Sequence, residues 1–262
     1  MTRKISHCAI LALTFSLFAL VSPAQSQPSP PVVRITQVQN LGPSPSNSLL
    51  LTIRVDWIAQ SRDPIFIVGF DVAVELKFPG GIRQLASTSV DENASGSFLR
   101  IRTATLLVPR PANANPISFE ASVTARWGTK GGALASKTFL ANEIAPGTVA
   151  NPTPLPCEAS LTFPTLEILG VNQPSTCLTG QDCFVVRWQA HVPCNATLGN
   201  FRVFALVYYG TQVRTAEKTV SSAARAASLT VTPPAGVALS SVEVDLSAGV
   251  TIFTTTELQG NF

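Results

Sequence analysis

Two parts of this 262-residue chain carry the same aromatic landmarks at the same spacing. Trp57 and Phe70 lie 13 positions apart, and Trp188 and Phe201 repeat that spacing 131 positions later. Repeat units of solenoid proteins are about 20–50 residues long. A period of 131 residues therefore predicts two copies of one domain rather than a solenoid.

Apolar and polar residues alternate along the first copy, which predicts strands with one buried face. Three stretches have this pattern, with apolar sets Leu49, Leu51, Ile53, Val55 and Trp57; Phe70, Val72, Val74, Leu76 and Phe78; and Phe119, Ala121, Val123, Ala125 and Trp127. The glycine-rich segment 128–132 predicts a turn into a last strand of this copy near 133–141. With no convincing helical period, the pattern indicates an all-β protein.

The N-terminus has the features of a secretory signal peptide. Arg3 and Lys4 precede an apolar run over residues 9–21, and small residues follow at Ala24 and Ser26. We expect cleavage after Ser26, with Ala24 as the alternative. The run of 13 residues is short for a bilayer, which needs about 20. The mature protein is therefore predicted to be secreted or extracytoplasmic, without a membrane span.

Proline-rich stretches divide the remaining chain. The predicted segments are a signal peptide (1–26), a Pro-rich leader (27–31), a first β-sandwich domain (32–145), a Pro-rich linker (146–156) and a second β-sandwich domain (157–262). Prolines in the linker make it semi-rigid rather than floppy.

The mature chain is close to neutral. Residues 1–26 contain two of the 18 Lys and Arg and none of the 15 Asp and Glu, so their removal leaves 16 cations against 15 anions. Nucleic-acid binding requires a clustered basic face, which this charge balance does not supply. We therefore expect no nucleic-acid partner.

Both copies resemble fibronectin type III and, more broadly, immunoglobulin-like β-sandwich domains. The resemblance consists of a Trp late in the second strand, an aromatic residue opening the third, and a late strand with alternating apolar residues, Phe119 to Ala125 or Val242 to Ala248. The corner tyrosine and the inter-sheet cysteine pair of these families are absent. The resemblance implies two tandem sandwiches and leaves the function open, since such folds have many roles.

Four cysteines of the mature chain lie between positions 157 and 194 and predict disulfides in an exported protein. In a sandwich of this kind, Cys177 and Cys183 lie at one end of the second strand, and Cys194 lies at the other end, where Cys157 enters. This arrangement favours the pairs Cys177–Cys183 and Cys157–Cys194 over the other two pairings. Zinc is the competing interpretation, but the spacing lacks a Cys-x2–4-Cys pair.

The third strand of the second copy is apolar on both faces. Its core face is predicted to be Phe201, Val203, Ala205, Val207 and Tyr209. The outer face then carries Phe204, Leu206 and Tyr208, where the first copy has Ala73, Glu75 and Lys77. Such a strand needs cover on both sides. Either the linker, a loop or the first domain covers it, or it contacts a partner or another copy of the chain.

Reactive side chains give little support to catalysis. His191 is the only mature histidine, and no nucleophile motif accompanies it. We predict a non-catalytic binding, adhesion or structural module with no cofactor or metal, whose partner is a protein or a glycan. The alternatives are a secreted hydrolase such as a glycosidase, which needs only two carboxylates, or its accessory region, and a subunit of a cell-surface assembly.

Overall fold

A computed structural model describes residues 28–62, 65–112, 114–129, 132–146, 152, 154–174 and 177–262. The predicted signal peptide and most of the predicted linker lie outside these residues. The strands are β1 (Val32–Ser44), β2 (Asn47–Ser61), β3 (Ile65–Lys77), β4 (Arg83–Ser95), β5 (Phe98–Pro109), β6 (Ser118–Thr129), β7 (Ala133–Leu140), β8 (Ala145–Pro146), β9 (Thr165–Gln173), β10 (Asp182–His191), β11 (Ala196–Tyr209), β12 (Gln212–Val220), β13 (Ala226–Val231) and β14 (Ser241–Asn261). The helical elements of these described residues are two 3-10 turns, η1 (Pro79–Gly81) and η2 (Ala141–Glu143).

The predicted all-β class is confirmed, because strands hold 71% of the described residues and helical turns 3%. The strands form three sheets, with orders β1-β2-β5, β13-β10-β9-β8 and β12-β11-β14-β6-β3-β4, and β7 also pairs with β14. All pairings are antiparallel except β8 with β9. Within the described residues, no helix is long and apolar enough to cross a membrane.

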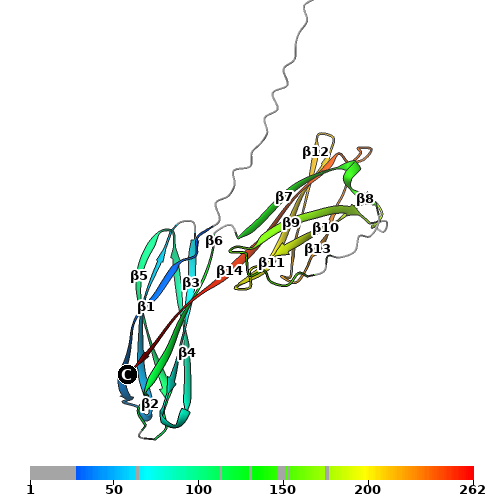
Figure 1. Cartoon of the computed structure of the whole chain (residues 1–262). Helices are drawn as coiled ribbons and strands as arrows, with labels where there is room; N and C mark the ends of the chain where they lie inside the picture. The colour runs from blue at the N-terminus through cyan, green and yellow to red at the C-terminus, as the bar shows by residue number, and fades with distance from the viewer. Residues whose placement is uncertain are drawn as a thin grey trace, which may run out of the picture.

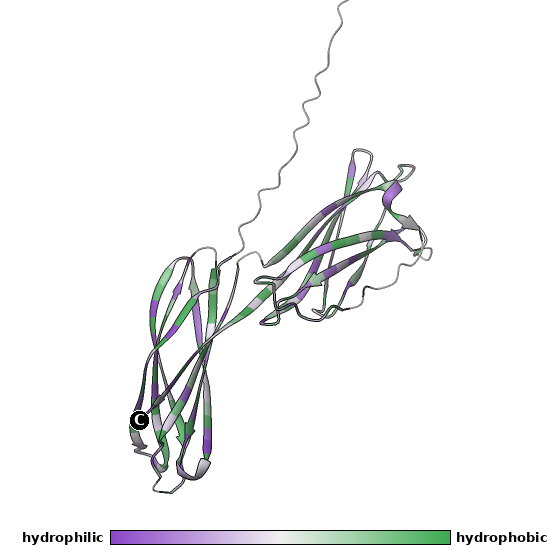
Figure 2. Ribbon diagram, viewed as in Figure 1, coloured by the Kyte–Doolittle hydropathy of each residue, from purple (hydrophilic) through white to green (hydrophobic). Residues whose placement is uncertain are grey.

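Two hydrophobic cores lie in two lobes, which Figure 1 shows side by side. Lobe 1 contains β1–β6 and the C-terminal half of β14 (Ile252–Asn261), and lobe 2 contains β7–β13 and the N-terminal half of β14 (Ser241–Ala248). Figure 2 shows apolar and polar residues alternating along the strands of both lobes. Alternation of this kind is what a sheet with one buried face requires.

The repeated aromatic landmarks form the centre of each core. Trp57 contacts Phe70 with ring centroids 5.4 Å apart, and Trp188 contacts Phe201 at 5.2 Å. All four side chains are fully buried. The apolar sets predicted for β3 and β6 are buried throughout, whereas Leu49, at the start of β2, is 53% exposed because it lies beyond the end of the core.

The last strands of the two lobes are exchanged. The predicted strand at 133–141 exists as β7, but it pairs with Ser241–Ala248 of β14 and not with β6. Its expected place beside β6 is taken by the far end of the chain, since Ile252–Asn261 of β14 pairs with Ser118–Trp127. The expectation that 133–141 closes the first copy is therefore wrong. β14 runs from lobe 2 into lobe 1 as one long strand (Figure 1).

The two segments pass each other at a point built on glycine. Gly132 has φ of +61°, and a Cβ on this residue would lie 2.1 Å from the carbonyl oxygen of Ala248. Asn195 anchors β14 at Phe253, five residues beyond Ala248. The side-chain amide of Asn195 donates to the backbone carbonyl of Phe253 at 2.9 Å, and the backbone carbonyl of Asn195 accepts from the Phe253 N–H at 2.7 Å. The crossing thus depends on close backbone contact, which side chains would obstruct.

Candidate partner-binding face

β11 has the two-sided apolar character that its sequence predicts. Its core face, Phe201, Val203, Ala205, Val207 and Tyr209, is buried as expected. The opposite side chains of Phe204, Leu206 and Tyr208 are half-buried on the outer face of the sheet. We call these three residues the apolar stripe. β11 lies between β12 and β14, so residues of those two strands line both flanks of the stripe.

Charged groups border the apolar stripe. On the β12 side, Arg202 donates from Nε and Nη2 to the two carboxylate oxygens of Glu217 at 2.6 and 2.9 Å. These hydrogen bonds and the charge of Arg202 lower the pKa of Glu217. On the β14 side, the Tyr208 hydroxyl donates to Glu243 at 3.1 Å, which raises the pKa of Tyr208. Arg202 is therefore neutralised, whereas the β14 side stays acidic.

Asp245 extends this acidic border next to Phe204, its partner in the β11–β14 register. Its side chain is exposed. Among the described residues, neither Asp245 nor Glu243 has an ion-pair partner. The outer face of lobe 2 thus combines an apolar centre with two uncompensated carboxylates.

A hollow of about 580 Å³ opens at one end of the stripe. Its lining residues are Leu134, Ala135, Ser136, Arg202, Phe204, Asp245, Leu246 and Ser247. Of the stripe, Phe204 lines the hollow, whereas Leu206 and Tyr208 lie farther along β11. Sequence reasoning missed Leu134 and Ser136, because it assigned β7 to the other lobe. Asp245 was not predicted either, although the alternation of Val242, Val244 and Leu246 indicates an outward side chain at this position.

The corresponding face of lobe 1 is polar and internally paired. Lys77 contacts Glu120 at 3.5 Å, Arg83 contacts Glu75 at 3.1 Å, and Arg126 contacts Asp71 at 3.5 Å. Lobe 1 therefore forms its sheet without an apolar outer face on this strand. The apolar stripe is a property of lobe 2 alone.

The cysteines pair as predicted. Cys157 bonds Cys194 with Cα atoms 4.7 Å apart, and Cys177 bonds Cys183 with Cα atoms 5.8 Å apart. The first bond fixes the segment entering lobe 2 to the loop between β10 and β11. Both bonds are typical of proteins from oxidising compartments.

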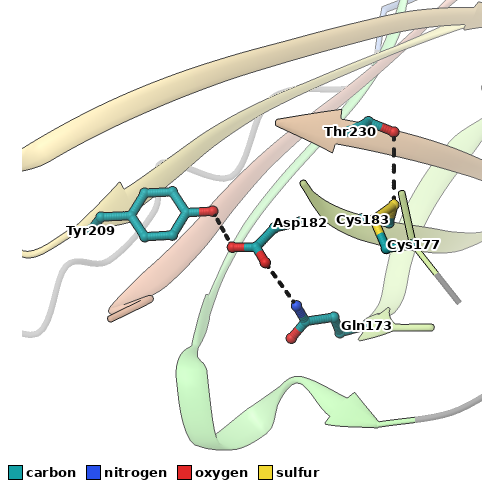
Figure 3. Close-up of a disulfide and its surroundings, with 6 residues drawn as sticks. All are labelled: Gln173, Cys177, Asp182, Cys183, Tyr209 and Thr230. Atoms are coloured by element: carbon teal, nitrogen blue, oxygen red, sulfur yellow. Dashed lines mark hydrogen bonds between the residues drawn. A yellow bond between two sulfur atoms is a disulfide. The ribbon is translucent and has the colours of Figure 1, made fainter. Parts of the chain in front are cut away.

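Asp182, next to Cys183 in the chain, links the start of β10 to two neighbouring strands (Figure 3). It accepts hydrogen bonds from the Tyr209 hydroxyl at 2.5 Å and from the Gln173 amide at 3.2 Å. Burial, followed by the hydrogen bond to Asp182, raises the pKa of Tyr209 well above its usual range. The protonated Tyr209 hydroxyl has a structural role, because its hydrogen bond to Asp182 links β11 to β10.

Other titratable groups do not assemble a reactive site in the part of the chain that the structure describes. His191, at the end of β10, contacts Glu158 through Nδ1 at 2.6 Å, so it is not simply solvated. The described residues contain no group of three or more His, Cys, Asp or Glu side chains able to hold a metal ion. No model of a protein family matches this chain, and no curated protein matches it either.

Proposed function

We propose that this protein is an exported, non-catalytic binding module of two immunoglobulin-like or fibronectin type III-like sandwiches, and that the apolar stripe holds a protein partner. The strand counts support the sandwich assignment. In lobe 1, a three-stranded sheet faces four strands of the long sheet, and seven strands in two sheets is the immunoglobulin layout. The two disulfides and the signal-like N-terminus support export.

The outer face of β11 carries the functional part of the proposal. Three large apolar side chains are half-buried there, although the corresponding strand of lobe 1 carries side chains in ion pairs. Burial of such side chains contributes roughly 1.5–3 kcal/mol each, and a few anchors of this kind dominate most interfaces. Because lobe 1 forms the same kind of sheet without such side chains, their presence on β11 is suited to binding a partner.

The border of the face indicates the chemistry of that partner. Glu243 and Asp245 lack cationic partners among the described residues, so a partner segment with apolar and basic side chains complements this face. The hollow beside Phe204 receives one such side chain. Its lining includes one carboxylate, Asp245, whereas a glycosidase needs two. The site therefore favours binding over glycoside hydrolysis.

The test is affinity capture from the native host with the oxidised protein on a solid support. A Phe204→Ser/Tyr208→Ser variant is compared with wild type and with a Leu85→Ser/Ile101→Ser control. The control removes two side chains of lobe 1 that are 65% and 70% exposed. We expect proteins captured by wild type and control to be lost from the stripe variant, with affinity for the purified partner at least tenfold weaker.

Two further measurements complete the test. Affinity should fall with rising salt, because Glu243 and Asp245 attract a basic partner. Thermal unfolding must show that the stripe variant is folded. Equal capture by stripe variant and wild type rules out the proposal, and capture that disappears after deglycosylation of the partner identifies a glycan ligand instead.

A further inference from the structure

Each lobe has a sheet edge that is completed by a strand from the other part of the chain. We call this edge, with the core surface beside it, the groove of the lobe. In lobe 1, β6 is paired along Ser118–Trp127 with the last strand of the chain. In lobe 2, β14 is paired along Ser241–Ala248 with β7. Together, β6 and β7 follow β14 over almost its whole length. The lobes are therefore joined by reciprocal strand insertion as well as by the covalent chain.

Each inserted strand contributes to the core of the lobe that receives it. Phe139 of β7 is 6% exposed and belongs to the core of lobe 2, and Ile252 of β14 is 1% exposed and belongs to the core of lobe 1. In lobe 1, the indole N–H of Trp127 donates to Thr254 at 2.9 Å. A lobe without its inserted strand exposes these partners and an unpaired strand edge, which is a template for another chain.

The groove of lobe 1 is closed by a strand that comes much later in the chain. β6 ends at Thr129, but the strand that completes its sheet begins at Ile252, more than 120 residues later. Until that strand arrives, an identical strand from a neighbouring molecule fits the groove with the same contacts. Exchange of identical elements between copies is a low-cost route to dimers.

We infer that a second copy of the chain can also fill this groove. Two copies then form a dimer by exchanging β7 and the C-terminal half of β14. In this dimer, lobe 1 of one molecule closes on lobe 2 of the other, and every strand pair of the monomer is kept. The choice between the two forms depends on concentration. A short linker keeps the two lobes of one chain at an effective concentration of the order of millimolar. The monomer therefore dominates in dilute solution.

A cysteine pair across the exchanged strands reports which molecule supplies the strand. Thr124 of β6 is opposite Thr255 of β14, with their Oγ1 atoms 2.8 Å apart. In a monomer, a Thr124→Cys/Thr255→Cys disulfide lies within one chain; in the exchanged dimer it joins two chains. The matched control is Asp71→Cys/Ser89→Cys, on paired residues of β3 and β4. That hairpin is not exchanged, so its disulfide is intramolecular in both forms.

The experiment refolds the full oxidised chain from denaturant at about 1 µM and at about 1 mM, which lie far below and close to the effective concentration. Light scattering after size exclusion should show monomer from the first sample and a substantial dimer fraction from the second. On a non-reducing denaturing gel, the dimer fraction should run at twice the chain mass for Thr124→Cys/Thr255→Cys and at the chain mass for the control.

Two outcomes overturn the inference. One is the absence of dimer at 1 mM, and the other is a dimer whose Thr124→Cys/Thr255→Cys form still runs at the chain mass. The second result assigns dimerisation to contact between surfaces. The Phe204→Ser/Tyr208→Ser variant separates this inference from the proposed function, because it should form the exchanged dimer as wild type does.

Discussion

The residue before the core tryptophan carries a charge in both lobes, and in both lobes it is buried. Asp56 precedes Trp57 and is 9% exposed, and Arg187 precedes Trp188 and is 8% exposed. Asp56 accepts hydrogen bonds from Arg54 at 2.9 Å and Thr103 at 2.5 Å. Alternation correctly predicted the outward face for Asp56. Its burial could not be predicted, because Thr103 reaches it from β5, a strand far along the sequence.

Removal of the Asp56 carboxylate should destabilise lobe 1. Asp56→Ala loses the hydrogen bonds from Arg54 and Thr103, and hydrogen bonds to charged groups contribute about 1.5–3 kcal/mol. We expect the free energy of unfolding at pH 7, measured by urea titration, to fall by about 2 kcal/mol. Asp91→Ala is the control, because the Asp91 side chain is 97% exposed. It should change stability by less than about 0.5 kcal/mol.

The same comparison should depend on pH. Burial raises the pKa of Asp56, but the hydrogen bonds from Thr103 and Arg54 and the charge of Arg54 outweigh it, so the pKa is lowered. A lowered pKa means that the carboxylate stabilises the fold above its unfolded pKa, and that this contribution is lost as pH falls through the folded value. The difference between wild type and Asp56→Ala should therefore shrink below about pH 4. A difference that stays constant down to pH 2 would contradict this assignment.

At the scale of elements, the sequence located strands better than it located their neighbours. The alternating patterns correctly predicted β3, β6 and the core face of β11, and the turn signal correctly predicted a strand at β7. The partner of β7 was wrong because alternation specifies which face is buried and not which strand lies alongside. β6 and β14 both accept an antiparallel neighbour, so local pattern cannot distinguish exchange from a simple hairpin.

A side chain at the crossing should disturb the exchanged strands. Gly132→Ala places a Cβ against the Ala248 carbonyl in addition to its positive φ. Gly236→Ala is the matched control, with φ of +70° and no atom within 4 Å of its Cβ position. The conformational penalty alone is about 1–2 kcal/mol. We expect Gly132→Ala to lower the thermal unfolding midpoint at least twice as much as Gly236→Ala, and equal shifts would show that the crossing has room for a side chain.

The two disulfides should differ in their contribution to stability. The Cys157–Cys194 bond spans 37 residues and the Cys177–Cys183 bond spans six. Loop-closure entropy predicts losses of about 4 kcal/mol for Cys157→Ala/Cys194→Ala and about 2 kcal/mol for Cys177→Ala/Cys183→Ala. Denaturant unfolding of both double variants measures the difference. A larger loss from the short loop would show that native contacts near Cys183, rather than chain entropy, dominate.

For the whole molecule, the repeated Trp–Phe spacing correctly located the centres of two cores, because Trp57 and Phe70 lie in one core and Trp188 and Phe201 lie in the other. What it could not indicate is that neither core is complete within its own stretch of sequence. The boundary predicted at residues 146–156 is crossed by the sheet hydrogen bonds that β14 makes with β6 and β7. β6 and β14 offer two similar sheet edges for a last strand, so the local sequence pattern leaves the choice undetermined.

The exchange predicts how fragments behave. A fragment of residues 27–145 lacks Ile252–Asn261, and a fragment of residues 146–262 lacks β7. Each should show weak or non-cooperative thermal unfolding by circular dichroism. An equimolar mixture, refolded together, should form a one-to-one complex with a cooperative transition. Cooperative unfolding of either fragment alone, at the midpoint of the full chain, would mean that the exchanged strand is dispensable.

The long strand β14 also changes how the molecule carries mechanical load. β1 and the end of β14 both belong to lobe 1, so lobe 2 is in effect an insertion between β6 and the last strand of its neighbour. Tension applied between Val32 and Asn261 is borne by the hydrogen bonds of lobe 1 and does not reach lobe 2 until lobe 1 yields.

In single-molecule pulling from these positions, lobe 1 should therefore always rupture first. Rupture of lobe 2 before lobe 1 would contradict this load path. A tandem pair in simple series would rupture at its weaker member, whereas here lobe 1 shields lobe 2, and with it the apolar stripe, from stretching.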